Sequence, residues 1–180
     1  MADGGVNIMF VYLGGEQVVP FDVTHVRIHR SVKIIPSAAL YNRRNLMSVE
    51  THNEMEKVKE YAFFGCTSLR GIKLPGVREV EEYAFYNCRQ LTDVEFGNKL
   101  ETIGGFAFYK CPLQKIKMPT LRTIGQWVFG DCKQLTDVEL PDIETIGYSA
   151  FDRCPPSSTH CHPIERQHVS SRYFSTIQPI

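Results

Sequence analysis

Apolar residues return along this chain with a period of about 22 residues. The recurring segment reads Ala-Phe-x-x-Cys in its clearest copies, and successive copies start 23, 22, 23, 21 and 22 residues apart. A fixed period of roughly 20–50 residues is the mark of a repeat protein. The copies are Ala39-Leu40-Tyr41-Asn42-Arg43, Ala62-Phe63-Phe64-Gly65-Cys66, Ala84-Phe85-Tyr86-Asn87-Cys88, Ala107-Phe108-Tyr109-Lys110-Cys111, Val128-Phe129-Gly130-Asp131-Cys132 and Ala150-Phe151-Asp152-Arg153-Cys154.

A short alternating pattern follows most copies. A leucine lies three residues after most of the cysteines, and two apolar residues separated by one polar residue come next. Alternation with period two over so short a run predicts a brief strand with one buried face. Cys111 departs from this spacing, because Pro112-Leu113 follows it directly and the unit is one residue short. The expected strand positions are Ile72 and Leu74, Val94 and Phe96, Ile116 and Met118, and Val138 and Leu140, preceded by a single Val49.

Two further apolar positions, three residues apart, complete each unit. Glycine follows three of these pairs, at Gly104, Gly125 and Gly147, and predicts a tight turn there. The Ala-Phe-x-x-Cys segment is then expected to be a short helical or 3-10 turn that leads to the next strand. The pairs are Val32 and Ile35, Met55 and Val58, Val77 and Val80, Leu100 and Ile103, Leu121 and Ile124, and Ile143 and Ile146.

No unit of this length can bury its apolar residues alone, so the units are expected to stack. Stacking brings equivalent positions into register and forms a continuous core of Ile/Val, Phe and Cys. The strands then make one parallel β-sheet along one face of the coil. Phe85 and Ile103 occupy repeated apolar slots, and we therefore expect both in the core.

The repeats divide the chain into three parts. Residues 23–154 are predicted to be the solenoid of about six units, starting with the partial unit Val23 to Ile28. Residues 1–22 are expected to be a β-hairpin cap that turns at Gly14-Gly15. Residues 155–180 lack the pattern and are predicted to be an irregular, disordered tail. The last strand edge would then be poorly protected, so the chain is expected to self-associate through its C-terminal edge or to be a shortened relative of a longer array.

The unit Leu-x-x-Val/Ile-x-Leu-Pro, followed by Ile-Gly-x-x-Ala-Phe-x-x-Cys-x-x-Leu, resembles the BspA-like class of leucine-rich repeats. The stretch Leu135 to Cys154 is nearly a consensus copy, and the resemblance covers roughly residues 23–154. The chain departs from the family at Arg43, which stands in the cysteine slot, and after Cys154. The resemblance implies an α/β-type leucine-rich-repeat solenoid, mostly β and irregular, that serves in protein interaction or adhesion. It supplies no catalytic residues.

Two exposed positions alternate in charge from unit to unit: one beside the apolar strand residues, and one directly after the first of the two later apolar residues. If the units stack in register, each side chain lies beside an opposite charge, which is worth roughly 0.2–1 kcal/mol per cross-strand pair. The alternation is either a mixed-sign face for a partner or a device that fixes the register. The first series is Arg27, Glu50, Lys73, Glu95, Lys117 and Glu139, and the second is Lys33, Glu56, Arg78, Glu101, Arg122 and Glu144. Related sequence also returns after 44 residues, as in Ile72-Lys73-Leu74-Pro75 and Ile116-Lys117-Met118-Pro119.

Overall charge and hydropathy exclude some partners. Lys and Arg number 20, as do Asp and Glu, so the formal net charge is zero. Proteins that bind DNA or RNA usually carry a positive excess or a basic stripe, so we expect no nucleic-acid partner. The apolar run Ile8 to Leu13 is too short for a signal peptide, and no run approaches the roughly 20 apolar residues of a membrane span. We therefore expect an intracellular, cytoplasmic protein with no membrane segment.

Five cysteines share one slot and could be core residues, disulfide partners or metal ligands. Adjacent strands lie about 4.8 Å apart, within reach of a disulfide by Cα distance. Cysteine also behaves as a small buried hydrophobe, and the spacing of the five fits no zinc template, so we interpret them as reduced core residues. Cys154, His160-Cys161-His162 and His168 come nearest to a metal site, but their spacing is irregular. We expect no metal and no cofactor.

The only tryptophan, Trp127, lies in a slot whose equivalents are Tyr61, Tyr83, Phe106 and Ser149. An aromatic stripe is therefore expected along one side, either as cover for the core or as a partner site. No phosphate-binding motif occurs, and we expect no enzyme. The sequence favours a protein-interaction or scaffolding module that binds through the strand face or the aromatic stripe. The alternatives are an adhesin-type surface repeat protein and a solenoid fragment without independent activity.

Overall fold

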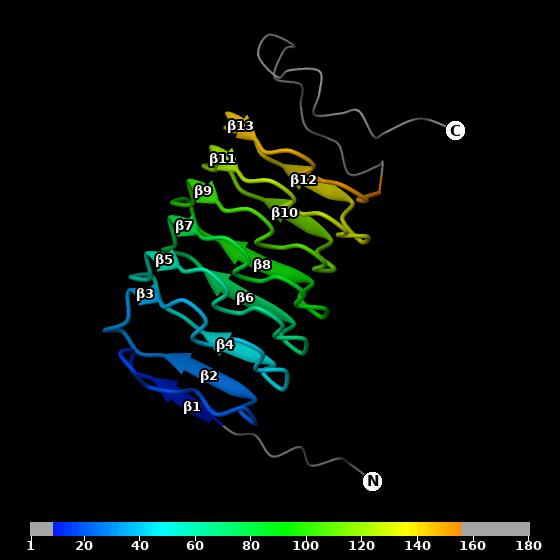
Figure 1. Ribbon diagram of the computed structural model, residues 1–180. Coiled ribbons are helices and arrows are strands. Elements are labelled where there is room, and N and C mark those ends of the chain that lie inside the picture. Colours follow the sequence, from blue (N-terminus) through cyan, green and yellow to red (C-terminus); the bar gives the residue numbers. More distant parts are fainter. Residues whose placement is uncertain (1–8, 156–180) are drawn as a thin grey trace.

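The computed structural model describes residues 9–155, which form a β-solenoid of six turns (Figure 1). Each turn, called a rung here, carries one strand of three or four residues and a second strand of two. The longer strands are β1 (Met9–Tyr12), β2 (His25–Ile28), β4 (Ser48–Glu50), β6 (Gly71–Leu74), β8 (Asp93–Phe96), β10 (Lys115–Lys117) and β12 (Asp137–Glu139). The shorter ones are β3 (Ile34–Ile35), β5 (Lys57–Val58), β7 (Glu79–Val80), β9 (Thr102–Ile103), β11 (Thr123–Ile124) and β13 (Thr145–Ile146). Rung 1 holds β2 and β3, and each later rung holds the next pair.

The longer strands form the parallel sheet that the sequence predicts. Its order is β1-β2-β4-β6-β8, and β10 and β12 form a separate pair beyond it. The register is set by the apolar positions, since Val26 lies opposite Val49, and Val49 opposite Ile72. The sheet therefore follows the predicted register but is interrupted between β8 and β10.

The shorter strands form a second parallel sheet, which the sequence did not predict. It runs without a break from β3 to β13 in chain order. Each of its strands has only two residues, too few to show an alternating pattern in the sequence. The solenoid consequently has two strand ladders rather than the single sheet expected.

A column of stacked phenylalanine rings runs through the core of the solenoid. Phe63, Phe85, Phe108 and Phe129 are fully buried, and neighbouring rings stack with centroids 4.8–5.8 Å apart. Ile103 and Phe85 are 1% and 0% exposed, so their predicted core positions are confirmed.

The Ala-Phe-x-x-Cys segments are turns, and the expected helical or 3-10 conformation is wrong. Within residues 9–155 no helix is present. Backbone amides in these turns alternate between two kinds of acceptor. Phe64 N donates to Tyr61 O within the turn at 3.1 Å, whereas Phe63 N donates to Ala84 O of the next rung at 2.7 Å. The bonds between rungs withdraw every second amide from a helical pattern, so the turns form a further ladder along the solenoid.

The glycines at positions 104, 125 and 147 are needed for close packing of the rungs. None of the three has a positive φ, so the conformational freedom of glycine, on which the predicted tight turn was based, does not explain why glycine occurs at these positions. A Cβ atom at any of them would lie closer than 3.0 Å to backbone atoms of the preceding rung. Any larger residue would push these rungs apart.

The N-terminal segment adds a parallel strand instead of the expected β-hairpin. β1 pairs with β2 in parallel, with Val11 opposite Arg27, and residues 13–24 contain no strand. The predicted turn is present, because Gly14 and Gly15 both have positive φ. Gln17 takes the place of the returning strand: its side-chain amide accepts from Leu13 N at 2.7 Å and donates to Val11 O at 3.3 Å. One side chain thereby satisfies part of the open edge of β1.

The predicted tail from residue 156 onward, with His160, Cys161, His162 and His168, lies outside the described residues. So do the first eight residues of the predicted N-terminal cap.

Candidate functional site

The charged series predicted as a partner-binding face lies on the outer side of the first sheet. We call Arg27, Glu50, Lys73, Glu95, Lys117 and Glu139 the strand charge ladder. Its side chains are half or more exposed, and they form ion pairs across neighbouring strands. The pairs are Arg27 with Glu50 at 2.5 Å, Lys73 with Glu95 at 2.6 Å, and Lys117 with Glu139 at 2.8 Å. The expected register is confirmed for these three pairs, but within residues 9–155 no ion pair joins Glu50 to Lys73 or Glu95 to Lys117.

The second charged series pairs in the same way. Lys33 and Glu56, Arg78 and Glu101, and Arg122 and Glu144 approach to 3.7, 3.4 and 2.6 Å. In both series the pairs join rung 1 to rung 2, rung 3 to rung 4, and rung 5 to rung 6. The ion pairs of both series are therefore organised in blocks of two rungs, which matches the 44-residue return in the sequence.

Backbone pairing in the first sheet follows the same blocks. Inside the blocks, register pairs extend to the charged residues: Arg27 lies opposite Glu50 and Lys117 opposite Glu139. Between rungs 2 and 3 the pairing ends at Val49 and Ile72, and between rungs 4 and 5 the strands do not pair. The charge ladder thus stabilises each block internally and leaves little unpaired charge for a partner.

Lys57 bridges two carboxylates beside the second sheet. Its ammonium group lies 2.9 Å from Glu79 and 2.5 Å from Glu81, and the Glu60 amide donates to Glu81 at 3.1 Å. Burial alone would raise the pKa of Glu81, but the hydrogen bonds from Lys57 and the Glu60 amide outweigh it and lower that pKa below 4.5. Hydrogen bonds to Glu81 and Glu79 raise the pKa of Lys57.

Aromatic side chains form two stacked columns on the turn side of the solenoid. We call the nine rings the aromatic ladder. In the first column, Tyr61, Tyr83, Phe106 and Trp127 stack at 5.0, 5.0 and 6.2 Å, and Tyr148 meets Trp127 edge-on. The second column is Tyr41, Phe64, Tyr86 and Tyr109, with spacings of 5.0, 4.9 and 5.2 Å.

The two columns touch each other and form one continuous surface. Tyr83 is tilted by 49° to Tyr86, and Phe106 by 61° to Tyr109. The stripe predicted from Trp127 is therefore confirmed, but the second column was missed. Its signal was present as the residue after Phe in Ala62-Phe63-Phe64 and in two later copies.

The aromatic ladder is partly open to solvent and its hydroxyls have no protein partner. Tyr41 and Tyr61 are each 38% exposed, Tyr148 is 62% exposed, and the remaining rings are half-buried. In residues 9–155 no hydrogen bond engages the hydroxyl group of any of the six tyrosines. Those tyrosines are Tyr41, Tyr61, Tyr83, Tyr86, Tyr109 and Tyr148. Rings that combine apolar edges with free hydroxyls are typical of protein interfaces.

The first column occupies a backbone position that disfavours aromatic residues. Each rung has two residues with positive φ, one on each side of the Ala-Phe turn. The position after the turn holds Asn, Gly or Asp in four of six rungs, residues that adopt this conformation readily. The position before it has φ of 52–57° yet holds Tyr61, Tyr83, Phe106 and Trp127. Bulky residues there cost on the order of 1 kcal/mol each, and the stacking of neighbouring rings offsets part of this strain.

The cysteine slot is a hydrogen-bond donor slot as well as a core position. Each thiol donates to a backbone carbonyl of the preceding rung, as Cys88 does to Phe63 O at 3.1 Å. The other bonds run from Cys66 to Leu40 O, Cys111 to Phe85 O, Cys132 to Phe108 O and Cys154 to Phe129 O, at 3.0–3.3 Å. The thiols are free, and all but Cys154 are buried. The predicted core position of these cysteines is confirmed.

The environment of the thiols differs between the middle and the end of the array. Burial raises the pKa of Cys66 to about 12. At the last described rung the interaction with the neighbouring Cys132 thiol lowers the pKa of the half-buried Cys154. Cys154 is consequently the described cysteine with the most thiolate character.

Arg43 fills the cysteine slot of rung 1 and performs the same bonding role. Its Nε donates to Val19 O of the N-terminal segment at 2.8 Å, and its Nη1 donates to Tyr41 O at 2.7 Å. The guanidinium carbon lies 4.1 Å from the centroid of the Phe21 ring. The departure from the repeat at this position therefore fastens the N-terminal segment to the solenoid.

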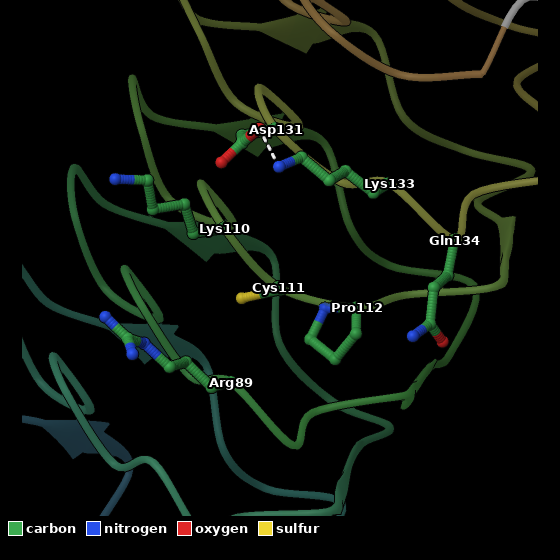
Figure 2. A pocket seen from close by; sticks show the side chains of 7 residues that line it. All are labelled: Arg89, Lys110, Cys111, Pro112, Asp131, Lys133 and Gln134. Carbon is green, nitrogen blue, oxygen red and sulfur yellow. Dashed lines mark ion pairs between the residues drawn. The ribbon is translucent and has the colours of Figure 1, made fainter.

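A surface hollow of about 410 Å³ lies where the short repeat turns toward β10 (Figure 2). It is lined by Arg89, Lys110, Cys111, Pro112, Asp131, Lys133 and Gln134. Among residues 9–155 no group of His, Cys, Asp or Glu side chains is arranged to hold a metal ion. The helix-free described region likewise contains no helix that could cross a membrane.

The fold is similar to solved bacterial repeat proteins. A leucine-rich repeat protein from Bacteroides ovatus is 22% identical, with a TM-score of 0.51, covering 76% of this chain and 51% of its own. The T. pallidum protein TpLRR is 23% identical, with a TM-score of 0.52, covering 83% and 79%. The pneumococcal vaccine antigen PcpA is 19% identical, with a TM-score of 0.50, covering 81% and 32%. The chain thus spans about half of the first of these proteins and a third of the last.

No curated protein matches the chain. The family model described as "BspA type Leucine rich repeat region (6 copies)" matches residues 21–119 and 68–180. These matches begin near the predicted start of the solenoid and extend beyond Cys154, where the repeat pattern was expected to stop. With most of its length covered, the chain belongs to the BspA-type leucine-rich repeat family.

Proposed function

We propose that this protein is a non-catalytic interaction module that binds a protein partner through the aromatic ladder. The observation that carries this proposal is the group of six tyrosine hydroxyls without a protein partner, on a continuous surface of nine rings. Tyr and Trp are the residues most enriched among those that dominate binding energy at interfaces. The strained backbone beneath Tyr61, Tyr83, Phe106 and Trp127 also favours a role for the rings themselves.

The strand charge ladder is the weaker candidate for the partner-binding face. Its opposite charges already pair with one another at 2.5–2.8 Å. A partner would have to replace these pairs, and exposed pairs of this kind contribute little energy. This self-neutralised face also disfavours nucleic acid as the partner, because it offers no row of free cations to phosphates. We therefore assign the charge ladder to fixing the register of the rungs.

The proposal is tested by capture with two matched bait variants. Tyr61→Asn with Tyr83→Asn removes two rings while keeping a residue type that occupies the other positive-φ column, at Asn42 and Asn87. Arg27→Gln with Glu50→Gln removes one ion pair at unchanged net charge. We expect a protein recovered by the wild type to be recovered by the charge variant and lost by the ring variant. Loss with the charge variant and retention with the ring variant would assign binding to the strand face instead.

An adhesin-type surface protein is the alternative function. PcpA, a solenoid of similar fold, is a pneumococcal vaccine antigen, and this similarity favours the alternative. This alternative requires a location at the cell surface, whereas we expected a cytoplasmic location from the sequence. Fractionation of cells that express the full-length protein separates the two, because a surface protein would be removed by protease added to intact cells.

A further inference from the structure

The unit that is one residue short leaves a gap in the solenoid surface. In rungs 3 and 5 the cysteine and leucine are separated by two residues, Arg89-Gln90 and Lys133-Gln134, whereas Cys111 and Leu113 are separated by Pro112 alone. The hollow of about 410 Å³ lies at this point. Figure 2 shows the long side chains of the neighbouring turns arranged around Cys111 and Pro112. We call this hollow the notch.

The missing residue also explains the break in the first sheet. The amides of Thr92 and Thr136 donate to the carbonyls of Arg70 and Gln114 in the preceding rungs. Within residues 9–155 no equivalent bond joins Gln114 to Thr92, and β8 and β10 do not pair. Val94 and Phe96 on β8 are only half-buried, unlike the residues at the same positions of rungs 3 and 5, which are buried. The notch is therefore accompanied by poorer packing of apolar residues at the junction between rungs 4 and 5.

The walls of the notch are two cationic side chains from the same slot of alternate rungs. Arg89 and Lys133 both follow the slot cysteine, and Pro112 lies between them in the sequence of rungs. Rungs spaced like adjacent strands, about 4.8 Å, place these two positions roughly 10 Å apart. A hollow of about 410 Å³ accommodates one or two side chains of a ligand.

The notch carries an excess of positive charge in a chain whose net charge is zero. Its charged residues are Arg89, Lys110 and Lys133 against Asp131, so the excess is 3 − 1 = +2. Lys133 lies 3.4 Å from Asp131. Arg89 donates only to the neutral Asn87 at 2.9 Å, and Lys110 lies 5.3 Å from the Tyr109 ring centroid. Among the described residues neither has a carboxylate partner, in contrast to the cations of the charge ladders.

We propose that the notch binds an acidic peptide segment, with its carboxylates between Arg89 and Lys110. This deepens the proposed function by naming the chemistry of a partner, and it rests on that function only in taking the ligand to be a protein segment. A short acidic peptide fits better than a nucleic acid, because the positive charge is confined to one hollow and the charge ladders beside it are self-paired. Lys110 follows Tyr109 directly, so a peptide leaving the notch can continue onto the aromatic ladder.

The experiment measures binding of a fluorescein-labelled pentaglutamate peptide to the full-length chain by fluorescence anisotropy at low ionic strength. We expect saturable binding that weakens as salt is added. Arg89→Gln with Lys110→Gln should weaken it by about tenfold. The matched control, Arg30→Gln with Arg44→Gln, removes two exposed cations of rung 1 and should leave the affinity nearly unchanged. Equal weakening by both pairs would overturn the proposal, as would no saturable binding to the wild type.

A third variant separates shape from charge. Replacing Pro112 by the dipeptide Arg-Gln restores the spacing of rungs 3 and 5 and adds one cation. Filling the notch should weaken pentaglutamate binding by about tenfold despite the added charge, whereas undiminished binding would show that the notch is not the site. Circular dichroism confirms that each variant is folded. A labelled oligothymidylate that binds the wild type as tightly as pentaglutamate would also contradict the proposal.

The ring variant Tyr61→Asn with Tyr83→Asn distinguishes this proposal from the proposed function. It should bind pentaglutamate like the wild type even when it no longer captures a protein partner. Failure of pentaglutamate binding with intact, ring-dependent capture would overturn only the notch.

Discussion

At the scale of single residues, the repeated slots have two requirements each. The cysteine slot needs a small apolar side chain and also a donor for a carbonyl of the preceding rung. The sequence revealed the first requirement, because the cysteines recur among core residues. The donor requirement could not be seen in the sequence, because the acceptor carbonyl lies some 25 residues away and comes close to the thiol only when the rungs stack. Arg43 looked like a departure from the repeat, yet it meets the donor requirement in a different way.

Cys154 is predicted to be the most reactive of the five described cysteines. Iodoacetamide reacts with the thiolate form of cysteine. Burial raises the pKa of Cys66 to about 12, whereas the interaction with the Cys132 thiol lowers the pKa of Cys154. The measurement is site-resolved mass spectrometry after timed iodoacetamide treatment of native protein, in a Cys161→Ser background. Cys154 should be labelled first, and labelling of Cys66 or Cys88 at the same rate would contradict the structure.

Glu81 is predicted to make stability depend on pH in the acid range. Its folded pKa is lowered by Lys57 and the Glu60 amide against the effect of burial, so its contribution is present above the unfolded pKa and is lost as pH falls below about 4.5. Urea unfolding should show a larger stability loss between pH of about 7 and about 3.5 in the wild type than in Glu81→Gln. An equal loss in both proteins would show that Glu81 contributes no such linkage.

At the scale of elements, the alternating apolar positions determined the first sheet and its register. The second sheet was not predicted, because strands of two residues show no alternating pattern in the sequence. The conformation of the Ala-Phe-x-x-Cys turns was not predicted either, because a positive φ at Tyr or Trp is not expected from sequence. The prediction of an N-terminal hairpin was wrong. It was based on the Gly-Gly turn between two apolar runs, a pattern that predicts antiparallel pairing. Here Gln17 satisfies part of that strand edge with its side chain, and β1 continues the parallel sheet.

Arg43 is predicted to hold the N-terminal segment on rung 1. Arg43→Met removes the charged donor from Val19 O and Tyr41 O while keeping much of the side-chain volume. The free energy of unfolding should fall by about 2 kcal/mol. Limited proteolysis should cut residues 13–22 sooner than in the wild type. Arg44→Met, one residue later and exposed, serves as the control and should change neither measurement.

Lys117 is predicted to stabilise the last two-rung block through register. Lys117→Glu places a carboxylate next to Glu139 across the β10–β12 pair. A small fall in melting temperature is expected, greater at low salt. Adding Glu139→Lys restores an opposite-charge pair in reversed order and should recover most of the loss. No recovery in the double variant would mean that the pair does not interact.

At the scale of the whole molecule, the solenoid is a stack of two-rung blocks on a continuous second sheet. Both charge series pair inside the blocks, and the first sheet weakens or breaks between them. This grouping matches the 44-residue return in the sequence, although the charge alternation alone predicted pairing between all neighbouring rungs. The short spacing at Pro112 was the only sign in the sequence of the break between rungs 4 and 5. It did not predict the break, because a single missing residue does not reveal which backbone hydrogen bonds are lost.

The polar groups of the strand face pair with one another, whereas the tyrosine hydroxyls of the aromatic ladder have no partner among the described residues. Ion pairs occupy the strand face, while the aromatic ladder presents free hydroxyls and ring edges. The sequence revealed the Trp127 column but could not rank the two faces, because ranking them requires knowing which polar groups already have partners. The free hydroxyls of the aromatic ladder are the reason that we propose it as the binding face.

The most direct test of this assignment uses Trp127, the only tryptophan in the chain. Its ring lies within the aromatic ladder, stacked on Phe106 at 6.2 Å and half-buried. Acrylamide quenching of its fluorescence is measured for the free protein and with a saturating amount of the captured partner, after Trp→Phe replacement in that partner. We predict a clear fall in the quenching constant when the partner binds. An unchanged quenching constant at saturation would contradict it, because the partner would then be bound elsewhere on the solenoid.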